Sequence, residues 1–97
     1  MREPVNWQPV AFADLTRIIR HITEENPIAA RRVGRELLLA ADSLLIFPRR
    51  GRHGRIPGTR ELVTVRPYII VYEVAEHDTA TILRVWHAAQ SRHDDHS

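Results

Sequence analysis

Residues 61–87 read ELVTVRPYIIVYEVAEHDTATILRVWH, and this stretch carries three strand signals in succession. Residues 61–66 are rich in β-branched side chains, which favour strands, and Pro67 interrupts them at a turn. Residues 69–74 form a nearly continuous apolar run, which is typical of a central strand. After a polar turn, residues 79–87 predict a last strand. We therefore expect an antiparallel meander of three strands.

Two amphipathic helices are predicted upstream of these strands. The first begins near Pro9, because a first helical turn does not need the N–H that proline lacks. Its apolar face carries Phe12, Leu15, Ile18, Ile19 and Ile22. Its polar face carries Asp14, Arg17, Arg20 and Glu24. Asn26 is the expected N-cap of the second helix, with Pro27 as its first residue. The second helix ends near Phe47-Pro48, and its stripe comprises Ala30, Val33, Leu37, Ala41, Leu44 and Leu45.

The predicted fold class is α+β, in the order β-α-α-β-β-β. A short strand at residues 5–8 precedes an antiparallel helix hairpin, which packs on one face of a small antiparallel sheet. The other face, together with the loop at residues 49–59, is left for solvent or a partner. We expect a single domain over residues 1–97, with its core at about 5–90 and a flexible tail at 91–97.

All 14 basic residues are arginine, so the sequence pI is 9.9 although the formal charge is only +2. Much of the excess is local and consists of Arg49, Arg50, Arg52, Arg55, Arg60 and Arg66, opposed by Glu61. Two interpretations stay open: a solvated face, or a binding surface for nucleic acid or an acidic protein.

The composition, 43% hydrophobic and 27% charged, is that of an ordinary globular protein. The chain has no cysteine, which excludes disulfides and thiolate metal sites. Neither an apolar leader nor a run of about 20 apolar residues is present, so we expect a cytoplasmic protein without a membrane partner. We expect no cofactor, and the spacing of His87, His93 and His96 argues against a zinc site.

The last strand carries the residues that are hardest to assign. Simple alternation places Ile82, Arg84 and Trp86 on one face. Arg84 is expected to stack on the Trp86 indole or to pair with Glu73 across strands. His87 is either packed at the strand end or catalytic, and Trp86 either packs on the sheet or anchors a partner.

The order of these patterns resembles that of the ParE/RelE superfamily of toxins from type II toxin–antitoxin systems. The resemblance covers about residues 5–92 and is closer to the ParE branch. It rests on Asn26-Pro27, on Phe47-Pro48 followed by Gly51, on Arg60-Glu61-Leu62, on residues 68–72 (YIIVY) and on residues 82–87 (ILRVWH). It implies a toxin neutralised by a cognate antitoxin that wraps around it.

The superfamily holds two activities, and both stay open. ParE-like members poison DNA gyrase by binding, and RelE-like members cleave mRNA on the ribosome. The absence of lysine and the long helix hairpin favour gyrase binding. The partner-binding candidates are Arg49, Arg50, Arg52, Arg55, Arg60, Arg66 and Trp86. If the protein is a nuclease, the catalytic candidates are Arg60, Arg66, Arg84 and His87, with His53 or Glu73 as further proton carriers. A partner-binding module without toxic activity is a third possibility.

Overall fold

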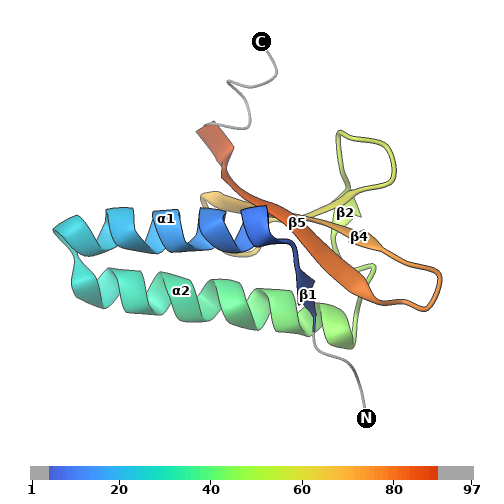
Figure 1. Ribbon diagram of the computed structural model, residues 1–97, viewed down its shortest axis with the longest axis horizontal. Coiled ribbons are helices and arrows are strands. Elements are labelled where there is room, and N and C mark those ends of the chain that lie inside the picture. Colours follow the sequence, from blue (N-terminus) through green and yellow to red (C-terminus); the bar gives the residue numbers. More distant parts are fainter. Residues whose placement is uncertain (1–4, 90–97) are drawn as a thin grey trace.

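The computed structural model describes residues 5–89. Its elements in chain order are β1 (Asn6–Trp7), α1 (Pro9–Glu25), α2 (Pro27–Asp42), the 3-10 turn η1 (Ser43–Leu45), β2 (Arg52–His53), β3 (Arg60–Leu62), β4 (Tyr68–Val74) and β5 (Ala80–His87). The strands form one five-stranded sheet in the order β1-β5-β4-β3-β2 (Figure 1). The predicted α+β class and element order are confirmed, and the tail at 91–97 lies outside the described residues.

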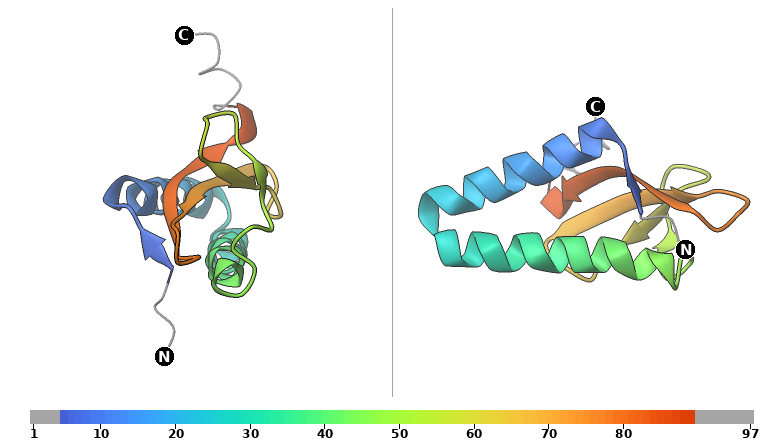
Figure 2. Two further views of the ribbon diagram at one scale, coloured as in Figure 1. Left: turned by 90° about the vertical axis from the view of Figure 1, so that its right-hand side faces the viewer. Right: turned by 60° about the horizontal axis from the view of Figure 1, so that its bottom comes forward.

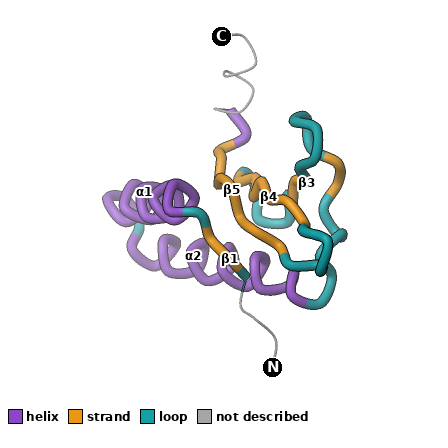
Figure 3. Tube along the Cα trace, turned by 45° about the vertical axis from the view of Figure 1, so that its right-hand side comes forward, coloured by secondary structure: helices purple, strands orange, loops and turns teal. Residues whose placement is uncertain are grey.

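The sheet differs from the prediction at both edges. β1 pairs with β5 in the parallel direction, so the sheet is mixed instead of wholly antiparallel. The expected loop at residues 49–59 contains a short strand, β2, which pairs antiparallel with β3. Loops flank β3 (teal in Figure 3), which makes this the least regular side of the sheet. Both outer strands have two residues each, and such short edges limit unwanted strand pairing.

The helix hairpin forms where the sequence predicts it. The Asn26 side chain accepts a hydrogen bond from the Ala29 N–H at 3.0 Å, and Pro27 is the first residue of α2. α1 and α2 therefore lie side by side, joined at Asn26 (Figure 2). Neither helix, within residues 5–89, is long and apolar enough to span a bilayer.

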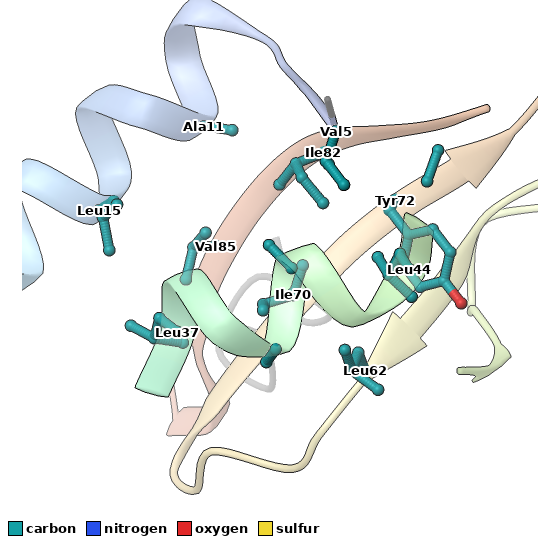
Figure 4. Packing of buried hydrophobic residues seen from close by; sticks show 13 residues of the cluster. Val5, Ala11, Leu15, Leu37, Leu44, Leu62, Ile70, Tyr72, Ile82 and Val85 are labelled. Atoms are coloured by element: carbon teal, nitrogen blue, oxygen red, sulfur yellow. The ribbon is translucent and has the colours of Figure 1, made fainter. Parts of the chain in front are cut away.

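The hydrophobic core lies between this hairpin and one face of the sheet. Leu37 and Leu44, from α2 and η1, are fully buried and point toward Ile70 and Tyr72 of β4 (Figure 4). The Tyr72 hydroxyl lies at the margin of the core, where it accepts a hydrogen bond from the Gly51 N–H at 2.9 Å. A Cβ at Gly51 would lie 2.7 Å from that hydroxyl oxygen, so glycine permits the close approach.

The burial of two residues of α1 is the reverse of what the helical spacing predicts. Phe12 was expected in the core but is 55% exposed, with its ring at the edge of Trp7. Asp14 was expected on the polar face but is 1% exposed. The reason is that α1 packs beside the edge of β5 as well as over the sheet, which rotates the buried face of the helix.

A β-bulge in β5 overturns the predicted alternation of its side chains. Val71 lies opposite Arg84 and Tyr72 lies opposite Ile82, so Leu83 has no partner across the strands. Ile82 and Val85 consequently both face the helices and are fully buried, although simple alternation puts them on opposite faces. Beyond the bulge, Arg84 and Trp86 face away from the helices.

Candidate functional site

The sheet face that points away from the helices carries a row of charged side chains. The strand pairing sets Arg52 opposite Glu61, Glu61 opposite Val71, and Val71 opposite Arg84. Glu61 is 4% exposed, and the Arg52 Nη2 donates to its Oε1 at 3.0 Å. The Arg55 N–H donates to Glu61 Oε2 at 3.3 Å. This buried carboxylate in β3 is therefore neutralised by two arginines of the preceding chain, Arg52 of β2 and Arg55.

Asp14 and Arg84 form a second ion pair, at the outer edge of β5. The Arg84 Nε donates to Asp14 Oδ2 at 2.7 Å and its Nη2 to Oδ1 at 3.0 Å, a two-pronged geometry. Asp14 Oδ2 also accepts from the Val85 N–H at 3.0 Å, and Oδ1 accepts from Arg17 Nη2 at 2.8 Å. The sequence-based expectations for Arg84, stacking on Trp86 or pairing with Glu73, did not include this partner, which lies 70 residues away in the chain.

The protonation of Asp14 follows from these contacts. Burial raises the pKa of the carboxyl group, but the hydrogen bonds from Arg84, Val85 and Arg17 outweigh burial and hold the pKa below its usual value. Asp14 is accordingly a carboxylate in the folded protein. It supplies an acceptor to a strand N–H that no neighbouring strand satisfies, because β1 ends at Trp7.

Arg49, Arg50 and Arg60 of the run also make internal contacts. Arg49 forms an exposed ion pair with Asp78 at 2.6 Å, and Arg50 donates to the Ser43 hydroxyl at 2.9 Å. Arg60 donates to the Gly51 carbonyl at 2.8 Å and to that of Arg49 at 3.2 Å. Several guanidinium groups of the run are therefore partly exposed and at the same time hydrogen-bonded within the protein. The run is a partly exposed cationic surface in which these groups are held in place.

Trp86 contributes the aromatic part of this surface. It lies opposite Ile69 on the face away from the helices and is partly buried. The Arg55 guanidinium carbon is 5.9 Å from the ring centroid, at the outer limit of a cation–π contact. The loop that holds Glu61 thus also reaches over the indole.

The four nuclease candidates are not brought together. Arg84 faces away from the helices, whereas Arg60 lies opposite Tyr72, whose side chain faces them. His87 lies opposite Tyr68, four residues along β4 and therefore about 13 Å from the position of Tyr72. Arg66 is exposed in the turn between β3 and β4. Of the additional proton carriers, Glu73 is exposed, and His53 lines a small cavity with Arg49 and Arg60.

His87 lies in a separate cavity of about 400 Å³ between α1 and the sheet. The cavity is lined by Arg17, Ile18, His21, Tyr68 and His87. The rings of Tyr68 and His87 meet edge to face, with centroids 5.6 Å apart. Burial raises the pKa of the Tyr68 hydroxyl, which stays protonated. The sequence analysis missed Arg17, His21 and Tyr68, and the only available signal was the one-turn spacing of Arg17 and His21.

No cluster of histidine and acidic side chains within residues 5–89 is arranged to hold a metal ion. His93 and His96, whose spacing from His87 argued against a zinc site, lie outside the described residues.

The architecture is a hairpin of two helices on one face of a small mixed sheet, and solved structures share it. The chain is similar to a solved structure titled "Chromosomal ParDE TA system from P. aeruginosa", with a TM-score of 0.77 and 24% identity over 89% of this chain and 96% of that one. It is also similar to the toxin–antitoxin complex RelBE2 from Mycobacterium tuberculosis, with a TM-score of 0.58 and 24% identity over 90% and 99%. At these identities the two structures support the fold.

The family follows from the sequence comparison. Residues 5–92 match the family described as "ParE toxin of type II toxin-antitoxin system, parDE", and the chain belongs to that family. It is 45% identical over 86 residues to Toxin RelE2 of Caulobacter vibrioides, covering 89% of this chain and 96% of the relative. It is 35% identical over 85 residues to Toxin RelE1 of the same organism, covering 84% and 89%. The chain is thus a toxin of the type II toxin–antitoxin class, as the sequence predicted.

Proposed function

We propose that this toxin acts by binding DNA gyrase and poisoning it, without catalysing a reaction itself. The observation that carries this proposal is the dispersal of the nuclease candidates over two faces of the sheet, with Arg84 held by Asp14. Cleavage of RNA at a 2′-hydroxyl needs a base, an acid and cationic groups around one phosphate. In this fold Arg84 and His87 face different sides, which disfavours a shared phosphate.

The surface that we propose for the target is the arginine run with Trp86, which covers the outer sheet face and the adjoining β2–β3 edge. Its members are Arg49, Arg50, Arg52, Arg55, Arg60, Arg66 and Trp86. The guanidinium groups of Arg49, Arg50, Arg52 and Arg60 are oriented by internal hydrogen bonds, so these side chains lose little entropy on binding. Tryptophan and arginine are also the residues that most often dominate a protein interface.

We also propose that a cognate antitoxin neutralises the toxin in the cytoplasm. The two solved structures above are titled as toxin–antitoxin assemblies, which supports such a partner. Large apolar side chains remain exposed at the end of α2 and just after it, at Leu39, Ile46 and Phe47. An exposed apolar group of this kind favours a protein partner over solvent.

A supercoiling assay with purified gyrase tests the target. We expect the full-length toxin to inhibit supercoiling, to accumulate cleaved DNA, and to lose both effects when its antitoxin is added. Trp86→Ala and Arg66→Ala should lower the potency of inhibition. Arg20→Ala, which removes an exposed arginine on α1 outside the proposed surface, should leave the potency unchanged.

The rival activity is tested in parallel by ribosome-dependent cleavage of a labelled message. This assay is needed because two relatives are named Toxin RelE1 and Toxin RelE2, and RelE-like members of the superfamily cleave mRNA. We expect no cleavage by the wild-type protein. Cleavage that disappears in His87→Ala, with the fold of that variant verified by circular dichroism, together with unimpaired gyrase, would overturn the proposal in favour of a nuclease.

A further inference from the structure

The cavity lined by Arg17, Ile18, His21, Tyr68 and His87 is not used by the proposed gyrase-binding surface. It opens between α1 and the ends of β4 and β5, on the sheet face toward the helices. The arginine run and Trp86 lie on the opposite face or at the far edge. Its volume of about 400 Å³ falls in the range of roughly 300–1,000 Å³ that is usual for small-ligand sites.

The α1 wall of the cavity favours an anion. Arg17 and His21 are four residues apart and therefore share one side of the helix. Asp14 takes one of the Arg17 donors at 2.8 Å and so orients the guanidinium group, while the carboxylate itself is neutralised by Arg84. None of the lining residues is acidic. A guanidinium fork and an imidazole, without a competing carboxylate in the lining, suit the oxygens of a phosphate.

The opposite wall favours a flat ring. Tyr68 and His87 meet at an interplanar angle of 89°, so each ring holds the orientation of the other. The His87 Nδ1 accepts from the Ala89 N–H at 3.1 Å, so a neutral ring carries its proton on Nε2 and can donate there. The Tyr68 hydroxyl stays protonated. Aromatic faces with nearby donors are the usual platform for nucleobases.

We propose that this cavity binds a nucleoside monophosphate unit, with its phosphate on Arg17 and His21 and its base against Tyr68 and His87. A free nucleotide and the phosphorylated end of a nucleic acid strand share this chemistry. An acidic side chain of a protein is too small to fill the cavity and would leave the ring wall uncovered. The inference does not depend on gyrase as the target.

Titration of the full-length protein with uridine 5′-monophosphate, followed by calorimetry and by NMR shifts of the histidine rings, tests the proposal. We expect saturable binding that is at least about tenfold tighter than that of inorganic phosphate or uridine alone. His21→Ala should weaken binding by about tenfold, the order expected for one charge-assisted hydrogen bond. Tyr68→Phe should retain most of the affinity, whereas Tyr68→Leu should lose the preference for nucleotide over phosphate.

The matched control is His77→Ala, which removes an exposed histidine in the β4–β5 turn, outside the cavity. It should bind uridine 5′-monophosphate as the wild type does.

A 5′-phosphorylated trinucleotide distinguishes a free nucleotide from the end of a nucleic acid strand. If the trinucleotide binds more tightly than the mononucleotide, and His21→Ala loses this binding, the ligand is a strand end. If the trinucleotide binds more weakly, the ligand is a free nucleotide. The absence of saturable binding, equal weakening in His77→Ala, or displacement by a glutamate-rich peptide as effective as the nucleotide would each overturn the proposal. Inhibition of gyrase by His21→Ala should remain at the wild-type level.

Discussion

The contacts that satisfy the backbone and charged groups differ between the β5 side and the β3 side of the sheet. At the β5 edge, a single carboxylate from α1 binds a strand N–H and the guanidinium group of Arg84, which is 70 residues away in the chain. At the β3 edge, β2 pairs with β3, the Arg60 side chain donates to the Gly51 carbonyl, and the Gly51 N–H donates to the Tyr72 hydroxyl of β4. The first edge depends on one long-range group, and the second on many local ones. The first should therefore be the more sensitive to a single substitution.

The largest effect is expected from Asp14→Ala. The change removes the carboxylate of Arg84 and leaves the buried Val85 N–H without this acceptor. Because Asp14 is buried but Arg84 is 39% exposed, we expect a loss of about 2 kcal/mol of unfolding free energy. Denaturant unfolding measures the loss. Asp42→Ala, at the exposed end of α2, is the matched control and should change stability by less than about 0.5 kcal/mol. Equal effects of the two substitutions would contradict a special role for Asp14.

Gly51→Ala should have the next largest effect, at the other edge. The new Cβ would lie 2.7 Å from the Tyr72 hydroxyl and 2.9 Å from the Glu61 carbonyl, so backbone must move, at a cost of about 2 kcal/mol. Tyr72→Phe removes the hydroxyl and should itself cost about 1 kcal/mol through the unsatisfied Gly51 N–H. The double variant should be slightly less destabilised than the sum, since the hydroxyl contact at 2.7 Å is gone while the ring carbon at 2.8 Å remains. Strict additivity would show that the two groups do not meet.

The pH dependence of stability tests the β5 edge, because this edge rests on Asp14, a carboxyl group whose pKa is lowered. A group with a lowered folded-state pKa contributes stability that is complete above its unfolded pKa and is lost as pH falls through the folded pKa. Wild-type stability should therefore decline below about pH 4. Asp14→Asn should remove part of this slope in unfolding curves recorded between about pH 5 and about pH 2. An unchanged slope would exclude Asp14 as its source.

The smallest effect is expected from Arg49→Ala. This arginine pairs with Asp78 at 2.6 Å, but the two side chains are 53% and 62% exposed, so water screens the charges. Exposed pairs contribute about 0.5 kcal/mol or less. Arg49 is the better site to change, because Asp78 has a positive φ of 62° and its substitution would also alter the turn. Thermal unfolding at low and high salt measures the effect, and a loss as large as that of Asp14→Ala would contradict the screening argument.

Much of the fold could be predicted because the signals were local. The cap at Asn26, the first helical residue Pro27 and the apolar run of β4 each reflect preferences of a few neighbouring residues. The exceptions have a tertiary cause. Phe12 satisfies the helical period and is nevertheless exposed, because α1 is rotated toward the edge of β5, where Asp14 is needed.

The candidate site was predicted less well than the fold. The concentration of arginines at residues 49–66 could be read from the sequence, but the contacts of Arg52, Arg60 and Arg49 with Glu61, Gly51 and Asp78 could not. The bulge at Leu83 reversed the expected neighbours of Arg84, since a shift of one residue moves a side chain to the other face. The cavity at His87 was missed because three of its five lining residues come from α1.

The amino-acid sequence by itself determined where the helices and strands lie, where α2 begins and where the cationic residues are concentrated. Backbone conformation and hydrophobic period act over a few residues, so these features need no knowledge of distant partners. Only the tertiary structure decided that β1 runs parallel to β5, that Asp14 binds Arg84 and that His21 and His87 share a cavity. Those contacts join residues far apart in the chain, and packing of the whole domain selects them from many alternatives that local preference leaves equal.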